Sequence, residues 1–251
     1  MADNSTMELA LRMGDNCLIL AQGLGAWCGH APAVEEDIAL ANTALDLIGQ
    51  TKLWLAYAGE IEGEGRSADD LAFLRDVREF RNCLLVEQPN GDYGRTLMRQ
   101  FLFDAWHYPM LTALTGSSDR GIAEIAEKSV KEATYQIERS RDLVIRLGDG
   151  DETSRAHMQA ALDELWRFTG ELTTPDAVDE ELAAKGAAPR LARIEKLYTE
   201  QMRVTLDEAT LVIPDGAPMQ QGGKAGFHSE TLGHLLSEMQ WLQRAYPGLQ
   251  W

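Results

Sequence analysis

Residues 122–147 read IAEIAEKSVKEATYQIERSRDLVIRL, and their apolar side chains recur at intervals of three and four. This spacing places them in one stripe along an α-helix, with the charged residues on the opposite face. Asp119 can cap the first turn of this helix, and we expect Gly148 to close it in the left-handed conformation. The stripe consists of Ile122, Ile125, Ala126, Val130, Ala133, Ile137, Val144 and Leu147.

Similar amphipathic segments cover most of the chain. We predict long helices at about residues 6–27, 34–61, 92–115, 152–172, 190–211 and 228–245, and shorter ones at about 68–82 and 176–184. The compact β-like runs, 84–86 and 211–213, have no neighbouring run that could pair with them. Glycine and proline gather between the predicted helices. We therefore predict one all-α domain over residues 1–251, folded as an antiparallel helical bundle.

Composition excludes several classes of protein. The 251 residues include 40 Asp and Glu against 23 Lys and Arg, a net charge of −17. Nucleic acids and anionic membranes both favour a basic surface, so neither is an expected partner. Three cysteines without a C-x-x-C pair argue against a disulfide framework and a thiolate zinc site. The polar start, residues 1–8, lacks the form of a signal peptide, so we expect a cytoplasmic protein.

A long helical bundle raises the question of a di-iron centre. Ferritin-like di-iron proteins use Glu-x-x-His pairs on two core helices. Only His107 has an acidic residue three positions before it, in Asp104-x-x-His107, so one half-site is present and the second is absent. Glu230, His234 and Glu238 form another stripe, which we interpret as a solvated face in preference to a metal site.

Several segments, in order along the whole chain, carry a resemblance to a known family. They are LRMGDNCL (11–18), WCGHAP (27–32), ALAN (39–42), LDLIGQ (45–50), LVEQPNG (85–91), DAWH (104–107), KEA (131–133), LWRFT (165–169), GGK (222–224), HSE (228–230) and EMQ (238–240). The sequence resembles the C subunits of the bacterial 1,2-phenylacetyl-CoA epoxidase.

The resemblance implies a ferritin-like fold and a place in a multicomponent monooxygenase that converts phenylacetyl-CoA to its ring 1,2-epoxide. In that family, a paralogous catalytic subunit holds the di-iron centre and binds the substrate. A reductase with FAD and an iron–sulfur cluster delivers electrons from NADPH. The C subunit is a structural companion, so the resemblance implies no catalytic residue, metal or other cofactor in this chain.

The resemblance also assigns a vestigial metal-centre region. The stretches that match the Glu-x-x-His motifs of the catalytic paralogue are 46–50 and 131–136, where Gln50 and Gln136 stand about where a histidine is expected. Glutamine is a poor iron ligand compared with imidazole. Asp46, Asp104 and Glu132 would remain as a metal-free polar cluster. Such buried carboxylates need hydrogen-bond donors, such as His107, or must keep a proton.

Two alternatives stay open at this point. The chain could be a metal-binding ferritin-like oxygenase in its own right, using Asp46, Asp104, His107 and Glu132. It could also contribute to CoA binding, because a glycine-rich loop with a lysine suits a phosphate. The residues of that possible CoA contact are Gly222, Gly223 and Lys224.

Aromatic residues suggest where a partner subunit would bind. We favour the helices at about 6–61 and 92–115 for the interface, because Trp27, Trp54, Trp106 and Tyr108 are typical anchor residues. The alternative is that these four side chains belong to the core.

Overall fold

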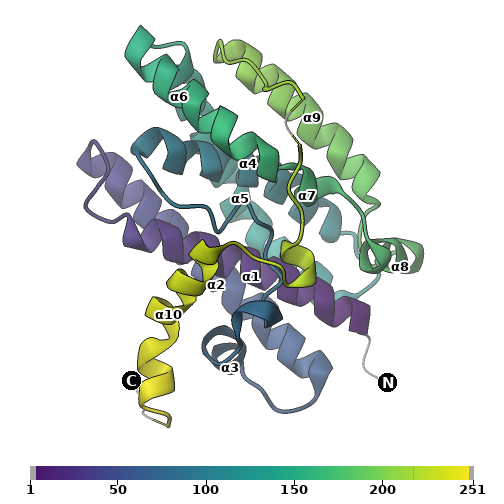
Figure 1. Ribbon diagram of the computed structural model, residues 1–251. Coiled ribbons are helices and arrows are strands. Elements are labelled where there is room, and N and C mark those ends of the chain that lie inside the picture. Colours follow the sequence, from purple (N-terminus) through teal and green to yellow (C-terminus); the bar gives the residue numbers. More distant parts are fainter. Residues whose placement is uncertain (1–3, 217, 249–251) are drawn as a thin grey trace.

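The computed structural model describes residues 4–216 and 218–248, and helices make up most of this part (Figure 1). Its centre is a bundle of four long helices, which confirms the all-α, ferritin-like prediction. These helices are α1 (Asn4–Ala26), α2 (Val34–Glu62), α4 (Tyr93–Leu114) and α5 (Arg120–Gly148).

The four central helices pack as two hairpins. α1 lies along α2, α4 lies along α5, and α2 also contacts α5. Short connections at 27–33 and 115–119 make each pair antiparallel. The core between them is filled by large apolar side chains such as Leu47, Trp54, Phe101 and Phe103, all fully buried. Polar side chains in the middle of this bundle are therefore enclosed by hydrocarbon.

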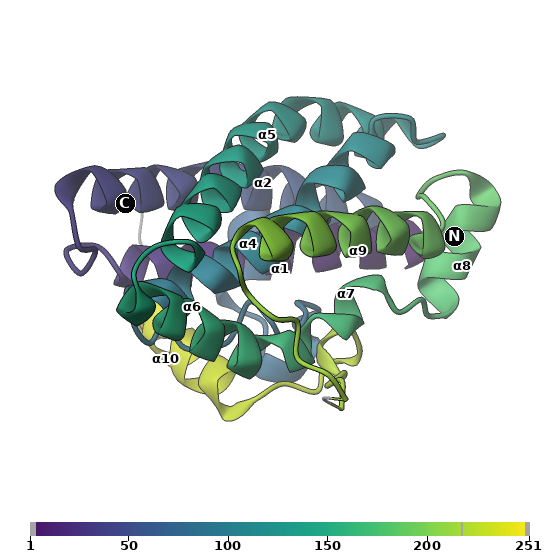
Figure 2. The same cartoon turned by 90° about the horizontal axis from the view of Figure 1, so that it is seen from above.

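The additional helices cover the bundle from several sides. α6 (Glu152–Leu165) and α9 (Leu191–Glu208) pack on α4 and α5, and both lie toward the viewer in Figure 2. α7 (Gly170–Thr173) packs against α9, and α8 (Ala177–Lys185) against α1. α10 (Glu230–Ala245) packs against α3 (Ala68–Phe73) and lies on the side away from α6 and α9 (Figure 1).

The predicted helix boundaries hold for most of the segments and fail for two of them, where short turns intervene. The segment predicted at 68–82 divides into α3 and a 3₁₀ turn, Val77–Glu79. The segment predicted at 152–172 divides into α6, the 3₁₀ turn Trp166–Phe168, and α7. The β-like runs 84–86 and 211–213 form turns and loops, and no strand occurs in 4–216 or 218–248. No helix in these ranges is long and apolar enough to cross a membrane.

The two predicted ends of α5 have different outcomes. Asp119 caps the helix, because its side chain accepts a hydrogen bond from the Ile122 amide at 3.0 Å. The expectation that Gly148 adopts the left-handed conformation is wrong, since its φ is not positive. Its role is close packing instead: a Cβ on Gly148 would lie 2.3 Å from the Ala209 carbonyl oxygen. Because Ala209 is far from Gly148 in the sequence, nothing in the sequence around Gly148 predicts this contact.

Candidate functional site

The six residues predicted for the vestigial metal-centre region lie on three neighbouring helices of the bundle. They are Asp46 and Gln50 on α2, Asp104 and His107 on α4, and Glu132 and Gln136 on α5. Gln50, Asp104, His107 and Gln136 are buried, whereas Asp46 and Glu132 are half-buried. The region is therefore a buried polar centre that opens at the line where α2 meets α5.

Cys17 on α1 joins this polar centre, and the sequence analysis missed it. Its Sγ lies 3.8 Å from Gln50 Oε1, to which it donates, and 3.8 Å from His107 Nε2. Burial raises the pKa of the Cys17 thiol, and the negative charges of Glu132 and Asp104 raise it further. The side chain is therefore a neutral thiol, not a thiolate. The available signal was its inward position on the predicted helix at 6–27.

His107 is enclosed by aromatic rings. Its ring centroid lies 4.8 Å from that of Phe103 and 6.1 Å from that of Trp106. Burial lowers the pKa of His107 to about 3, so the imidazole is neutral at physiological pH. Its Nδ1 atom has no hydrogen-bond partner in the part of the chain that the structure describes.

Asp104 is held by two donors. Gln100 Nε2 donates to Oδ1 at 2.7 Å, and Ser140 Oγ donates to Oδ2 at 2.8 Å. Burial raises the pKa of Asp104 to about 7, although these hydrogen bonds and the charge of Arg139 favour the ionised form. Desolvation is the larger effect, so this carboxyl keeps its proton up to near neutral pH.

Asp46 and Glu132 face each other across the line between α2 and α5. Gln50 Nε2 donates to Glu132 Oε2 at 3.0 Å. Burial raises the pKa of both carboxyls, and the charge of Asp46 raises that of Glu132 further. Gln136 lies close enough to Asp46 to oppose the rise in the pKa of Asp46. Neither amide atom of Gln136 reaches hydrogen-bond geometry with a partner in residues 4–216 and 218–248.

The residues of this centre do not fit a di-iron site. The inward positions three residues before Gln50 and Gln136 are Leu47 and Ala133, which are both buried. Residues 47–50 therefore read Leu-x-x-Gln and residues 133–136 read Ala-x-x-Gln, and neither stretch is a Glu-x-x-His pattern. Iron in such proteins takes carboxylate and imidazole ligands. In the described part of the chain, no three His, Cys, Asp or Glu side chains gather so that they could hold a metal ion.

The stripe on α10 has the solvated character predicted for it. His234 Nε2 lies 3.7 Å from Glu230 Oε1, and the two side chains are 79% and 92% exposed. Glu238 is exposed as well. A contact this open to water contributes little to stability.

The loop of the predicted CoA contact turns its backbone donors inward. The amides of Gly222 and Lys224 donate to Glu171 Oε1 at 2.9 and 3.2 Å, and the Leu84 amide donates to Oε2 at 2.8 Å. Gly223 packs so tightly that a Cβ would lie 2.1 Å from the Asn82 carbonyl oxygen. The amides that would hold a phosphate therefore bind a buried carboxylate.

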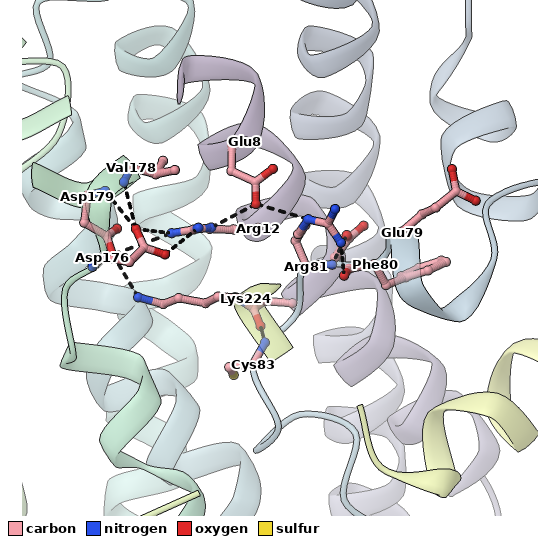
Figure 3. Close-up of polar contacts among 12 residues, drawn as sticks. Glu8, Arg12, Glu79, Phe80, Arg81, Cys83, Asp176, Val178, Asp179 and Lys224 are labelled. Carbon is pink, nitrogen blue, oxygen red and sulfur yellow. Dashed lines mark hydrogen bonds and ion pairs between the residues drawn. The ribbon is translucent and has the colours of Figure 1, made fainter. Parts of the chain in front are cut away.

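The Lys224 ammonium is also engaged within the chain. It donates to Asp179 Oδ2 and to the Thr174 carbonyl, each at 3.0 Å. Figure 3 shows Lys224 and Arg12 converging on Asp176 and Asp179 from two directions. A phosphate would have to compete with these carboxylates, and the CoA contact stays a prediction.

Two of the four suggested interface aromatics belong to the core. Trp54 and Trp106 are buried, so the interpretation of them as interface anchors is wrong and the alternative, that they belong to the core, holds for both. Trp27 and Tyr108 are half-buried and pack against the same core. The surface of the α1–α2 hairpin instead offers aliphatic residues along α2.

Comparison with known proteins agrees with the resemblance found in the sequence. The model of a family described as "Phenylacetic acid catabolic protein" matches residues 1–251. The C subunit of the 1,2-phenylacetyl-CoA epoxidase of Escherichia coli (strain K12) is 47% identical over 248 residues, which span 99% of this chain and 100% of that protein.

Proposed function

Since this chain belongs to the family of phenylacetic acid catabolic proteins, we propose that it is a non-catalytic structural subunit of a 1,2-phenylacetyl-CoA epoxidase. Its role is to stabilise and position the paralogous di-iron catalytic subunit during aerobic phenylacetate breakdown. The similarity to the E. coli protein over nearly the whole chain supports a place in such a complex.

The observation that carries the non-catalytic role is the pair of buried glutamines. Gln50 and Gln136 stand on the inward faces of α2 and α5, with Leu47 and Ala133 one turn before them. An amide and a hydrocarbon side chain replace the two iron ligands that each motif would supply. The neighbouring thiol of Cys17 and the neutral imidazole of His107 are sealed inside the core. Oxygen chemistry is then the task of the partner.

The outer face of α2 supports a role in holding a partner. Four large aliphatic residues are exposed along one side of this helix at intervals of four, seven and three. This is the spacing of a seam into which another long helix packs. The residues are Val34, Ile38, Leu45 and Ile48, which are 71%, 55%, 65% and 48% exposed. We propose that a helix of the di-iron subunit packs on this face.

We propose that the other subunits and the cofactors of the complex are those that the resemblance implies. The di-iron centre belongs to the paralogous catalytic partner, and a reductase carrying FAD and an iron–sulfur cluster supplies electrons from NADPH. We propose that the complex lies in the cytoplasm. This chain then needs no cofactor of its own.

Iron content tests the non-catalytic role. The chain is expressed alone with added ferrous iron, desalted, and measured for iron per chain, beside the di-iron subunit treated in the same way. We expect a value near zero for this chain and about two atoms for the control. A value of about two for this chain would show that it builds a centre of its own. The structural role is tested separately: mixing the two purified chains should give one stable hetero-oligomer on size exclusion.

A further inference from the structure

The line where α2 meets α5 contains two carboxylates without a counter-ion. Asp46 and Glu132 are half-buried there, and no ion pair to either occurs in the described residues, 4–216 and 218–248. Arg139, on the same side of α5, is already paired with Glu36 of α2. Two neighbouring negative charges, partly removed from water, repel each other, and a cation that joins them would favour the ionised form of both.

A buried amide beside these carboxylates also lacks a partner. Gln136 is 3% exposed, and within the described residues neither its Nε2 nor its Oε1 reaches hydrogen-bond geometry with a partner. The side chain lies against Asp46. An unpaired polar group at such depth is costly, and buried amides normally have partners. The free Oε1 is an acceptor placed beside two carboxylates, which together suit a group with several N–H donors.

Exposed apolar side chains border the acidic pair. Leu45 and Ile48 on α2 and Tyr135 on α5 are 65%, 48% and 57% exposed. When a partner covers such residues, they exclude water from the polar contact between them. The pair therefore lies within the face that the proposed function assigns to the di-iron subunit.

We propose that Asp46 and Glu132 receive a basic side chain from the di-iron subunit, which also donates to Gln136 Oε1. This inference rests on the proposed function, because it names the contact that the partner makes. Net charge argues for the di-iron subunit as the molecule that occupies this site. A second copy of this chain carries the same net charge of −17, so two copies would repel each other. A metal ion would find two carboxylates and the Gln136 amide oxygen, and no three His, Cys, Asp or Glu side chains gather to hold a metal in the described residues.

Titration calorimetry tests this contact by measuring how tightly the chain binds the purified di-iron subunit. The double variant Asp46→Asn/Glu132→Gln keeps the shapes of both side chains and removes both charges. We expect its dissociation constant to rise about 30-fold or more, as when one partner of a buried charge pair is removed. Its affinity should also depend less on salt concentration than that of the wild type.

A matched control removes two charges elsewhere. Asp207→Asn/Glu195→Gln changes two exposed carboxylates on α9 by the same amount and should bind like the wild type. Thermal unfolding of both double variants checks that each is folded. A zero-length carbodiimide links carboxylates to lysine but not to arginine. A cross-link from Asp46 or Glu132 therefore identifies an ammonium, whereas weakened binding without a cross-link identifies a guanidinium.

The outcomes separate this inference from the proposed function. If the wild-type chains associate and the Asp46/Glu132 variant binds equally well, the site is overturned and the structural role stands. If the control variant weakens binding as much, the effect is one of overall charge and the site is again overturned. If the wild-type chains do not associate at all, the proposed function fails, and the site fails with it.

Discussion

His228 and Glu87 form a buried ion pair that fastens the segment before α10 to the loop before α4. His228 Nδ1 lies 2.8 Å from Glu87 Oε2, and the two side chains are 1% and 0% exposed. His228 Nε2 lies 3.0 Å from the Phe80 carbonyl oxygen. Both ring nitrogens face acceptors, so both carry a proton and the ring is an imidazolium. Burial lowers the pKa of His228, but Glu87 and the Phe80 carbonyl outweigh it, and the pKa is raised.

This ion pair predicts a loss of stability with rising pH. A histidine with a raised folded pKa contributes stability that is complete below its unfolded value of about 6.5. The contribution is lost as the pH rises through the folded pKa. Urea unfolding at pH 6 and pH 9 should therefore show a larger fall in the free energy of unfolding for the wild type than for His228→Gln. Equal falls in the two proteins would show that His228 is neutral in the folded state.

His228→Gln should itself be strongly destabilising at pH 6. The substitution leaves the buried Glu87 carboxylate with only the Asn82 amide and the Ser229 backbone as donors. Removing one member of a buried pair typically costs about 3–5 kcal/mol. His234→Gln provides the control, because His234 is exposed on α10. That variant should unfold like the wild type.

Asp104→Asn should stabilise the chain at alkaline pH. Burial raises the pKa of Asp104 to about 7, so ionisation of this carboxyl above pH 7 opposes folding. The penalty begins near the unfolded pKa of about 4 and is complete above the folded pKa, where it reaches up to about 4 kcal/mol. The neutral amide avoids this penalty. The advantage of Asp104→Asn in urea unfolding should therefore be largest at pH 8 and shrink toward pH 4.

A separate observation would contradict this interpretation of Asp104. If Asp104→Asn lowers the free energy of unfolding at pH 8, the ionised carboxylate is the form that the core stabilises. Ser140→Ala is a useful companion, because Ser140 Oγ donates to Asp104 Oδ2. Loss of that donor should raise the pKa of Asp104 further, and carbon NMR of the carboxyl can follow the change.

Helical periodicity explains how much of the architecture is predictable from sequence. The stripe in 122–147 depends only on local spacing, and α5 forms where it predicts. Contacts between distant residues are different. His228 and Glu87 are 141 positions apart, and nothing near either residue indicates the pairing. The same holds for Gly148, whose close approach to Ala209 is visible only in the fold.

The candidate site is predictable in its residue types but not in its connections. The match to the motifs of the catalytic paralogue directs attention to Gln50 and Gln136, and both side chains lie buried in the bundle. Packing decides which side chains of α2 and α5 face the core. Leu47 and Ala133 point inward, so Asp46 and Glu132 lie at the edge of the bundle. Cys17 escapes attention because a buried cysteine looks like any small apolar residue in a helical stripe.

Lys224→Ala distinguishes an internal role for this lysine from a role in CoA binding. Lys224 donates to Asp179, whose side chain is 9% exposed, so its loss should lower the free energy of unfolding by about 1–3 kcal/mol. Lys185→Ala is the matched control, since Lys185 pairs with Glu181 on the exposed side of α8. If Lys224→Ala unfolds like the wild type but weakens phenylacetyl-CoA binding by the assembled complex, the CoA contact gains support. Unchanged substrate affinity would remove it.

The aliphatic seam on α2 gives the sharpest prediction about assembly. Leu45→Glu/Ile48→Glu places two charges on side chains that are 65% and 48% exposed, so the isolated chain should unfold like the wild type. In the complex these charges would lose their hydration and replace the aliphatic contact with the di-iron subunit, and association should fail at micromolar concentration. Leu197→Glu on α9, where Leu197 is 47% exposed, is the control and should still co-elute with the partner. Loss of the complex with Leu197→Glu, together with normal assembly of the α2 variant, would move the interface to the α9 side of the bundle.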